Sequence, residues 1–143
     1  MAFVGELTLS DPILFGPTFE EVREATMEFE DVHYVTDGGE IHYVFFCWVS
    51  GCAFDDYEAA LEDDSTVREF RAVTDVADRQ LYRLVTRTFP EVQPLAFPLY
   101  REYDITEIES KRTVDGFHMR ARFPSRRMLR RFQERLKERG SRL

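Results

Sequence analysis

Two cysteines and three histidines are the residues of this chain with the widest range of chemistry. Cys47 and Cys52 form a C-x4-C pair, which could close a disulfide or supply two thiolates to a metal ion. The other ligands would have to come from His33, His42 and His118, and none of these stands at zinc-site spacing. We therefore expect no metal site, and two reduced thiols buried as small apolar side chains.

His33 and His42 keep a second interpretation open. They fall on the two strands of one expected hairpin, and a turn centred on Gly38 brings them close to opposite each other. A pair of histidines changes charge near neutral pH and can bind metal ions, so it could act as a sensor. A purely structural role for both side chains is the alternative.

Aromatic residues gather in the same region of the sequence. They are Tyr43, Phe45, Phe46, Trp48, Phe54 and Tyr57. Large rings dominate the buried area of most protein cores, but the same side chains line pockets for small apolar ligands, so both interpretations stay open. The candidate ligand-binding residues are Tyr43, Phe45, Trp48, Tyr57, His33 and His42.

The sequence lacks the common motifs of catalysis. It contains no G-x-S-x-G nucleophile motif, no phosphate-binding loop and no H-E-x-x-H metal motif. The acid pairs Asp55-Asp56 and Asp63-Asp64 flank an expected helix, where acids favour the helix N-terminus or are solvated, and we prefer this role to a carboxylate dyad. We expect no catalytic residues and no cofactor.

Charge is unevenly distributed along the chain. The 27 acidic residues exceed the 19 basic ones, of which only Lys111 and Lys137 are lysine, so the net charge is −8. Such an acidic, lysine-poor surface suggests a halophilic source, because molar salt screens charge repulsion beyond about 3 Å. Residues 1–110 hold 7 arginines against 24 acids, net −17, whereas residues 111–143 hold 12 basic residues against 3 acids, net +9.

The basic end of the chain lies on an expected helix. Its candidate nucleic-acid-binding residues are Arg126, Arg127, Arg130, Arg131 and Arg135. A cationic helix face can neutralise phosphates and release counterions, and this makes direct DNA binding the alternative function. We prefer the interpretation that these arginines pair with the acidic part of the chain or with an acidic neighbouring subunit.

Hydrophobic periodicity and turn residues predict a mainly antiparallel α+β fold. We expect strands at 6–10, 25–35, 41–49, 67–76, 80–86, 103–113 and 117–123, and helices at 17–22, 54–61 and 125–139. Asp37-Gly38-Gly39 and Asp115-Gly116 predict tight hairpin turns. Thr18 and Ser125 are the expected N-caps of the first and last helices, and Gly140 the expected stop of the last.

These elements predict one domain, residues 1–143, with two halves at about 1–87 and 103–143. The proline-rich segment 89–98 should cross between them. Two or three helices on one face of the sheet, in split-βαβ (ferredoxin-like) halves, are the expected architecture. The N-terminus has neither a secretory signal nor an anchor, which predicts a cytoplasmic protein without membrane attachment.

Three stretches carry a resemblance to a known family. They are ELTLS, FDDYEAALEDDSTVREFRAVTDVADRQLYRLVT and DGFHMRARFPSRRMLRRFQERLKERG. With the order of elements, they resemble the N-terminal domain of haloarchaeal bacterio-opsin-activator-type helix-turn-helix regulators. The resemblance implies a further strand and a DNA-binding domain after the last helix, and this sequence includes neither.

The resemblance implies a role in transcriptional regulation. We expect a non-catalytic regulatory domain that senses a small-molecule ligand or mediates self-association. Its expected partners are a second copy of the chain or another transcription regulator, because an unfinished sheet edge favours strand addition. DNA is a partner only if the basic helix binds it directly.

Overall fold

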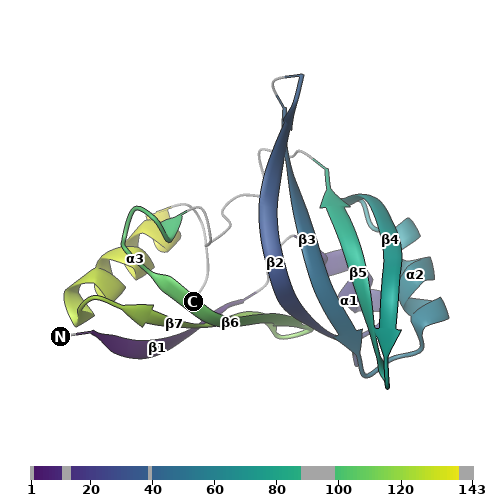
Figure 1. The fold of residues 1–143 in the computed structure, drawn as a ribbon, viewed down its shortest axis with the longest axis horizontal. Helices are drawn as coiled ribbons and strands as arrows, with labels where there is room; N and C mark the ends of the chain where they lie inside the picture. The colour runs from purple at the N-terminus through teal and green to yellow at the C-terminus, as the bar shows by residue number, and fades with distance from the viewer. Residues whose placement is uncertain (1, 11–13, 39, 88–98, 139–143) are drawn as a thin grey trace.

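The computed structural model describes residues 2–10, 14–38, 40–87 and 99–138 as seven strands and three helices (Figure 1). In chain order they are β1 (Phe3–Leu9), α1 (Gly16–Glu21), β2 (Thr26–Asp37), β3 (Glu40–Ser50), α2 (Phe54–Glu62), β4 (Val67–Val76), β5 (Arg79–Thr86), β6 (Thr106–Thr113), β7 (Gly116–Phe123) and α3 (Arg126–Glu138). Each expected strand and helix is present. The sixth strand begins at Thr106, three residues later than expected.

All seven strands belong to one antiparallel sheet, in the order β1-β7-β6-β2-β3-β5-β4. The α+β class with mainly antiparallel pairing is therefore confirmed. The unit β3–α2–β4–β5 has the split-βαβ arrangement, because β5 lies between β3 and β4 and is antiparallel to both.

The first strand joins the other half of the sheet. β1 pairs along its whole length with β7, from Phe3 opposite Phe123 to Leu9 opposite Phe117. The first half thus consists of β2 to β5 with α1 and α2, and the second half of β1, β6, β7 and α3. The expected boundary, which groups residues 1–87 together, differs from the structure at this strand.

Each half has its own hydrophobic core. In the first, α1 and α2 cover the sheet, and the buried side chains include Phe19, Phe45 and Tyr57. In the second, α3 places the fully buried Phe132 and Leu136 against β7. Burial of these side chains supplies the main driving force for folding of each half.

One row of cross-strand neighbours links the two halves on the face that carries the helices. Phe117 lies opposite Arg112, Arg112 opposite Met27, and Met27 opposite Val49. Such neighbours point to the same face of a sheet. The buried Arg112 guanidinium lies 4.6 Å from the ring centre of Phe19 on α1, so the helices of both halves share this face, as expected.

Two helix caps were predicted, and only one is correct. Ser125 Oγ accepts a hydrogen bond from the Met128 N–H at 3.2 Å and caps α3 as expected. In α1 the N-cap is Phe15, with a left-handed φ of 63° and no side-chain cap, so the prediction of Thr18 is wrong.

Thr18 instead binds a buried carboxylate. Asp64, at the end of α2, accepts hydrogen bonds from the Thr18 N–H and hydroxyl at 3.2 and 2.5 Å. It also accepts from the Thr66 N–H and hydroxyl at 2.8 and 2.7 Å. Asp64 therefore holds α1 in place from outside the helix. No local sequence pattern predicts this contact, because the two residues are far apart in the chain.

Two sequence expectations fall outside the described residues, the crossing segment 89–98 and the helix stop at Gly140. Within the described residues, every helix is too short or too polar to span a membrane.

A candidate ligand cleft between the two halves

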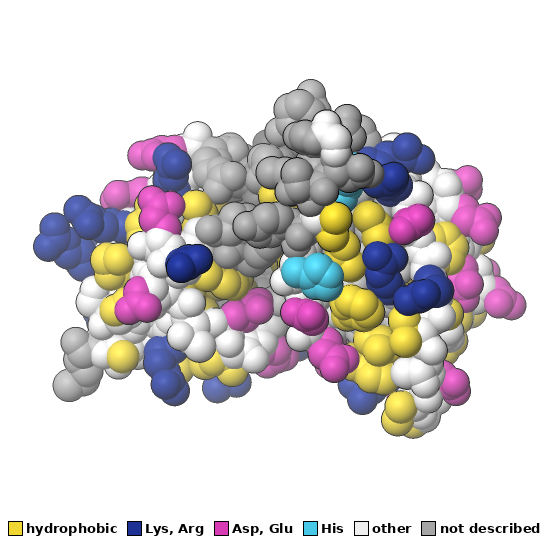
Figure 2. All heavy atoms as spheres, turned by 45° about the horizontal axis from the view of Figure 1, so that its top comes forward, with side chains coloured by type: hydrophobic (Ala, Val, Ile, Leu, Met, Phe, Trp, Pro, Cys, Tyr) yellow, Lys and Arg dark blue, Asp and Glu magenta, His cyan; other side chains and the backbone are white. Residues whose placement is uncertain are grey.

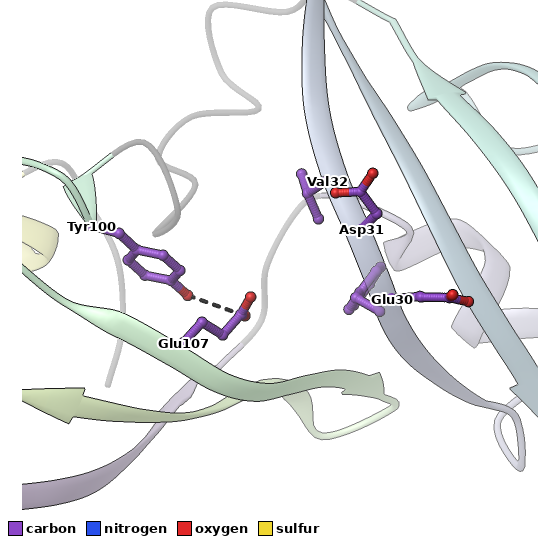
Figure 3. A pocket seen from close by; sticks show the side chains of 6 residues that line it. Glu30, Asp31, Val32, Tyr100 and Glu107 are labelled. Atoms are coloured by element: carbon purple, nitrogen blue, oxygen red, sulfur yellow. Dashed lines mark hydrogen bonds between the residues drawn. The ribbon is translucent and has the colours of Figure 1, made fainter.

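A cleft of about 210 Å³ lies where the two halves of the sheet meet. Its lining residues are Phe29, Glu30, Asp31, Val32, Tyr100 and Glu107. The first four belong to β2, whereas Glu107 belongs to β6 and Tyr100 precedes it. In Figure 3, Tyr100 and Glu107 face the β2 residues across the opening, so each half supplies one wall.

A β-bulge shapes the β2 wall. Phe29 pairs with Cys47 and Asp31 with Phe46, which leaves Glu30 as the extra residue of β2. Phe29 before the bulge and Val32 after it both pack against the edge of the first core and line the cleft, so the alternation of the strand shifts by one residue. The bulge thus brings both Phe29 and Val32, three positions apart, to the cleft, whereas the Glu30 side chain turns toward β3.

Tyr100 and Glu107 form the opposite wall. The Tyr100 hydroxyl donates to Glu107 Oε1 at 3.4 Å and lies 3.7 Å from the sulfur of Met119. Burial, with the nearby Glu107 charge and this hydrogen bond, raises the pKa of Tyr100 well above its ordinary value. The phenol therefore stays protonated at physiological pH, and its proton is directed to Glu107 within the same wall.

The lining charge of the cleft is negative. The acids among the lining residues are Glu30, Asp31 and Glu107, and none of the lining residues is basic. Asp31 Oδ2 lies 3.6 Å from Nδ1 of His33. Glu30 accepts a hydrogen bond from the Trp48 indole N–H at 2.8 Å, which holds its carboxylate toward β3. In the described part of the chain, no three histidine, cysteine or acidic side chains converge to hold a metal ion.

The expected ligand-binding residues lie elsewhere. Phe45 and Tyr57 are fully buried and fill the first core. Tyr43 packs against the same core, and the buried His42 places Nδ1 3.0 Å from the Thr86 carbonyl oxygen. None of these side chains lines the cleft between the halves.

Trp48 and His33 lie on the opposite face of the sheet. Trp48 carries the guanidinium of Arg79 over its ring at 4.8 Å, and the His33 ring stacks with Phe46 at 6.0 Å between centroids. His33 pairs with Val44 and His42 with Val35, so the two histidines are two positions out of register. His33 is exposed and His42 buried, and the structure does not unite them as one site.

Both cysteines are free thiols, and Cys47 is fully buried. Burial raises the pKa of Cys47 well above that of an ordinary thiol. Burial, with the charges of Glu24 and Asp56, raises the pKa of the half-buried Cys52 to about 11. Both groups are therefore poor nucleophiles at neutral pH.

The arginines of α3 point to solvent. Those proposed as nucleic-acid-binding residues, Arg126, Arg127, Arg130, Arg131 and Arg135, are all exposed. Arg135 pairs with Glu138 of the same helix at 3.6 Å, and the Arg126 guanidinium lies 5.7 Å from the ring centre of Phe3. The preferred pairing of these arginines with the acidic first half is not observed within the described residues.

Sequence reasoning missed the cleft, although one signal of it is present. Met27 and Phe29 occupy odd positions in β2, whereas Val32 and Tyr34 occupy even ones, and this change of phase indicates a bulge. Bulges often occur next to functional sites. No comparable signal marks Tyr100 or Glu107, which reach the cleft only through tertiary packing.

Comparison with known proteins agrees with the family resemblance noted from the sequence. Residues 6–143 match the family described as "BAT: GAF and HTH_10 associated domain". No curated protein and no solved structure matches the chain. The match covers nearly all of the sequence and indicates a regulatory domain. The chain belongs to the BAT family, the associated domain of bacterio-opsin-activator-type regulators.

Proposed function

We propose that this chain is a non-catalytic, ligand-sensing domain for transcriptional regulation, and that its ligand occupies the cleft between the two halves. The observation that carries the proposal is the position of the cleft. Its walls come from β2 in the first half and from Tyr100 and Glu107 in the second. A bound molecule would therefore contact both halves at once.

The connection between the halves is narrow enough to respond to a ligand. β2 and β6 pair only at Met27 with Arg112 and at Glu28 with Lys111. A ligand that binds one relative arrangement of the halves more tightly shifts the equilibrium toward that arrangement. The change in free energy cannot exceed the difference between its binding free energies for the two arrangements. The cleft borders the short pairing of β2 and β6. A ligand that prefers one arrangement of the halves would therefore change how these two strands lie relative to each other.

The lining favours a small organic cation. Carboxylates of Asp31 and Glu107 attract positive charge, and the ring of Tyr100 suits a cation with an apolar body. The small volume favours a compact molecule. This chemistry differs from that expected from the aromatic cluster of the sequence, whose members fill the core or lie on the other face.

Backbone NMR of the full chain tests the proposal with choline and spermidine as probes, in a constant KCl background. Binding should move the amide signals of Val32 and Glu107. Val32→Trp should fill the cleft and abolish the shifts, whereas Ile108→Trp, at an exposed position beside Glu107, should keep them. Probes that leave these signals in place, or shifts that survive Val32→Trp, would contradict the proposal.

A further inference from the structure

Four arginines at the start of α3 form a surface that the ligand cleft does not involve. This basic face consists of Arg126, Arg127, Arg130 and Arg131, all exposed. No ion pair joins any of them to an acidic side chain among the residues that the structure describes. Figure 2 shows Lys and Arg side chains gathered at this end of the molecule.

The position of the basic face on its helix is unfavourable for folding. Arg126 and Arg127 lie in the first turn of α3, which contains no acid. The N-terminus of a helix carries the positive end of the macrodipole, so cations there reduce helix stability. A role in binding an anionic partner would explain why these positions are arginine.

A complementary surface lies at the other end of the molecule. This acidic face consists of Glu20, Glu21, Asp55, Asp56, Glu62 and Asp63, all exposed on or directly after α1 and α2. The two helices contain no lysine or arginine, and no ion pair joins these carboxylates to another described residue. Figure 1 places α3 at one end of the longest axis and α2 at the other.

We propose that the basic face of one copy binds the acidic face of a second copy, so that two chains associate side by side in opposite directions. Each α3 then meets the partner's α1 and α2, and the two equal contacts close a symmetric dimer. Arginine suits this contact because its guanidinium binds carboxylates through two parallel hydrogen bonds.

Charge favours a second copy over a nucleic acid. The net charge of the chain is −8, so a polyanion is repelled by most of the molecule, whereas another copy presents both signs in the required places. Partly buried ion pairs are also screened less by salt than exposed contacts to phosphates. The inference is independent of the proposed ligand site, because neither face includes a cleft residue.

Charge-swap variants test the inference by analytical ultracentrifugation across a range of protein and KCl concentrations. Arg127→Glu/Arg130→Glu/Arg131→Glu reverses the basic face, and Glu21→Arg/Glu62→Arg/Asp63→Arg reverses the acidic face. Both reversals place charges that suit the helix dipoles, so neither should prevent folding. Arg101→Glu/Arg120→Glu/Arg122→Glu, exposed positions outside α3, makes the same change of charge as the basic-face reversal and is its control.

The wild type should dimerise, and the dimer should weaken as KCl rises. Each reversal alone should weaken dimerisation roughly tenfold or more, and an equimolar mixture of the two should restore it, since every contact regains opposite charges. The control should dimerise like the wild type. A monomeric wild type, reversals without effect, or no recovery on mixing would overturn the inference. A monomer that shifts duplex DNA through the basic face would favour a nucleic-acid partner instead.

Discussion

The ring of Phe29 stacks on the ring of Phe117, with centroids 5.1 Å apart and planes 8° from parallel. Phe29 packs against the core of the first half, and Phe117 against that of the second. This contact therefore joins the two cores beside the short pairing of β2 and β6. It also borders the proposed ligand site, because Phe29 lines the cleft.

The stack should couple the stability of the two halves. Phe29→Ala and Phe117→Ala should each lower the free energy of unfolding by about 2 kcal/mol, less than a fully buried phenylalanine because both rings are partly exposed. A double-mutant cycle by urea unfolding should give a coupling free energy of about 1 kcal/mol. Additive effects of the two substitutions would show that the rings do not act together.

Asp64 should matter far more than its neighbour in the sequence. Asp64→Asn replaces one of the two acceptor oxygens with an amide NH2 group that faces the donors of Thr18 or Thr66, and should lower the free energy of unfolding by about 2 kcal/mol. Asp63→Asn makes the same chemical change in an exposed side chain, and should alter the free energy of unfolding by less than about 0.5 kcal/mol. Chemical denaturation of both variants measures the difference, and equal effects would refute the role of the buried network.

Two neighbouring tyrosines should respond oppositely to loss of their hydroxyl. The Tyr57 hydroxyl is buried beside the Cys47 thiol, a weak hydrogen-bonding group, and has no stronger partner among the described residues, so Tyr57→Phe should leave stability unchanged or raise it by up to about 1 kcal/mol. The Tyr82 hydroxyl donates to Glu58 at 3.0 Å, so Tyr82→Phe should cost about 1 kcal/mol. Thermal unfolding ranks the two variants, and the reverse order would contradict the expectation.

The thiols should react slowly until the pH is high. With its pKa raised to about 11, Cys52 should react with iodoacetamide at pH 8 roughly 100-fold more slowly than an ordinary thiol, and Cys47 more slowly still. Both should react at the ordinary rate in guanidinium chloride. Mass spectrometry of the alkylated protein gives the rates, and fast labelling of the folded protein at pH 8 would contradict the burial of these groups.

The same shifts predict how stability depends on pH. The folded state holds the thiol protons more tightly than the unfolded state, in which the pKa of a thiol is about 9.0. The raised pKa of Cys52 therefore contributes fully to the free energy of unfolding below pH 9, and this contribution is lost as the pH rises toward 11. Replacing Cys52 with alanine should reduce the loss in that range, as measured by urea unfolding at several pH values.

Local chemistry accounts for the parts of the fold that the sequence predicted. The turns at Asp37-Gly38 and Asp115-Gly116 specify hairpins between adjacent segments, and the apolar spacing of α2 and α3 specifies their buried sides. The pairing of β1 with β7 escaped prediction because its partners are more than a hundred residues apart. No turn or period in the sequence specifies such a contact.

The candidate site escaped prediction for a related reason. The aromatic cluster is contiguous in sequence, but in a strand successive side chains point to opposite faces, so Phe45 enters the core whereas Trp48 lies on the other side. The cleft is instead assembled from β2 and from residues about seventy positions later. Its two walls become neighbours only when the halves dock.

The bulge at Glu30 has a consequence for how β2 tolerates substitution. A saturation scan of the strand should reveal a requirement for apolar side chains at Met27 and Phe29 before the bulge and at Val32 after it. The pattern of permitted residues would thus invert midway along one continuous strand. Deleting Glu30 would force one of the two segments to turn its apolar side to solvent, so the length of β2 is constrained as tightly as its composition.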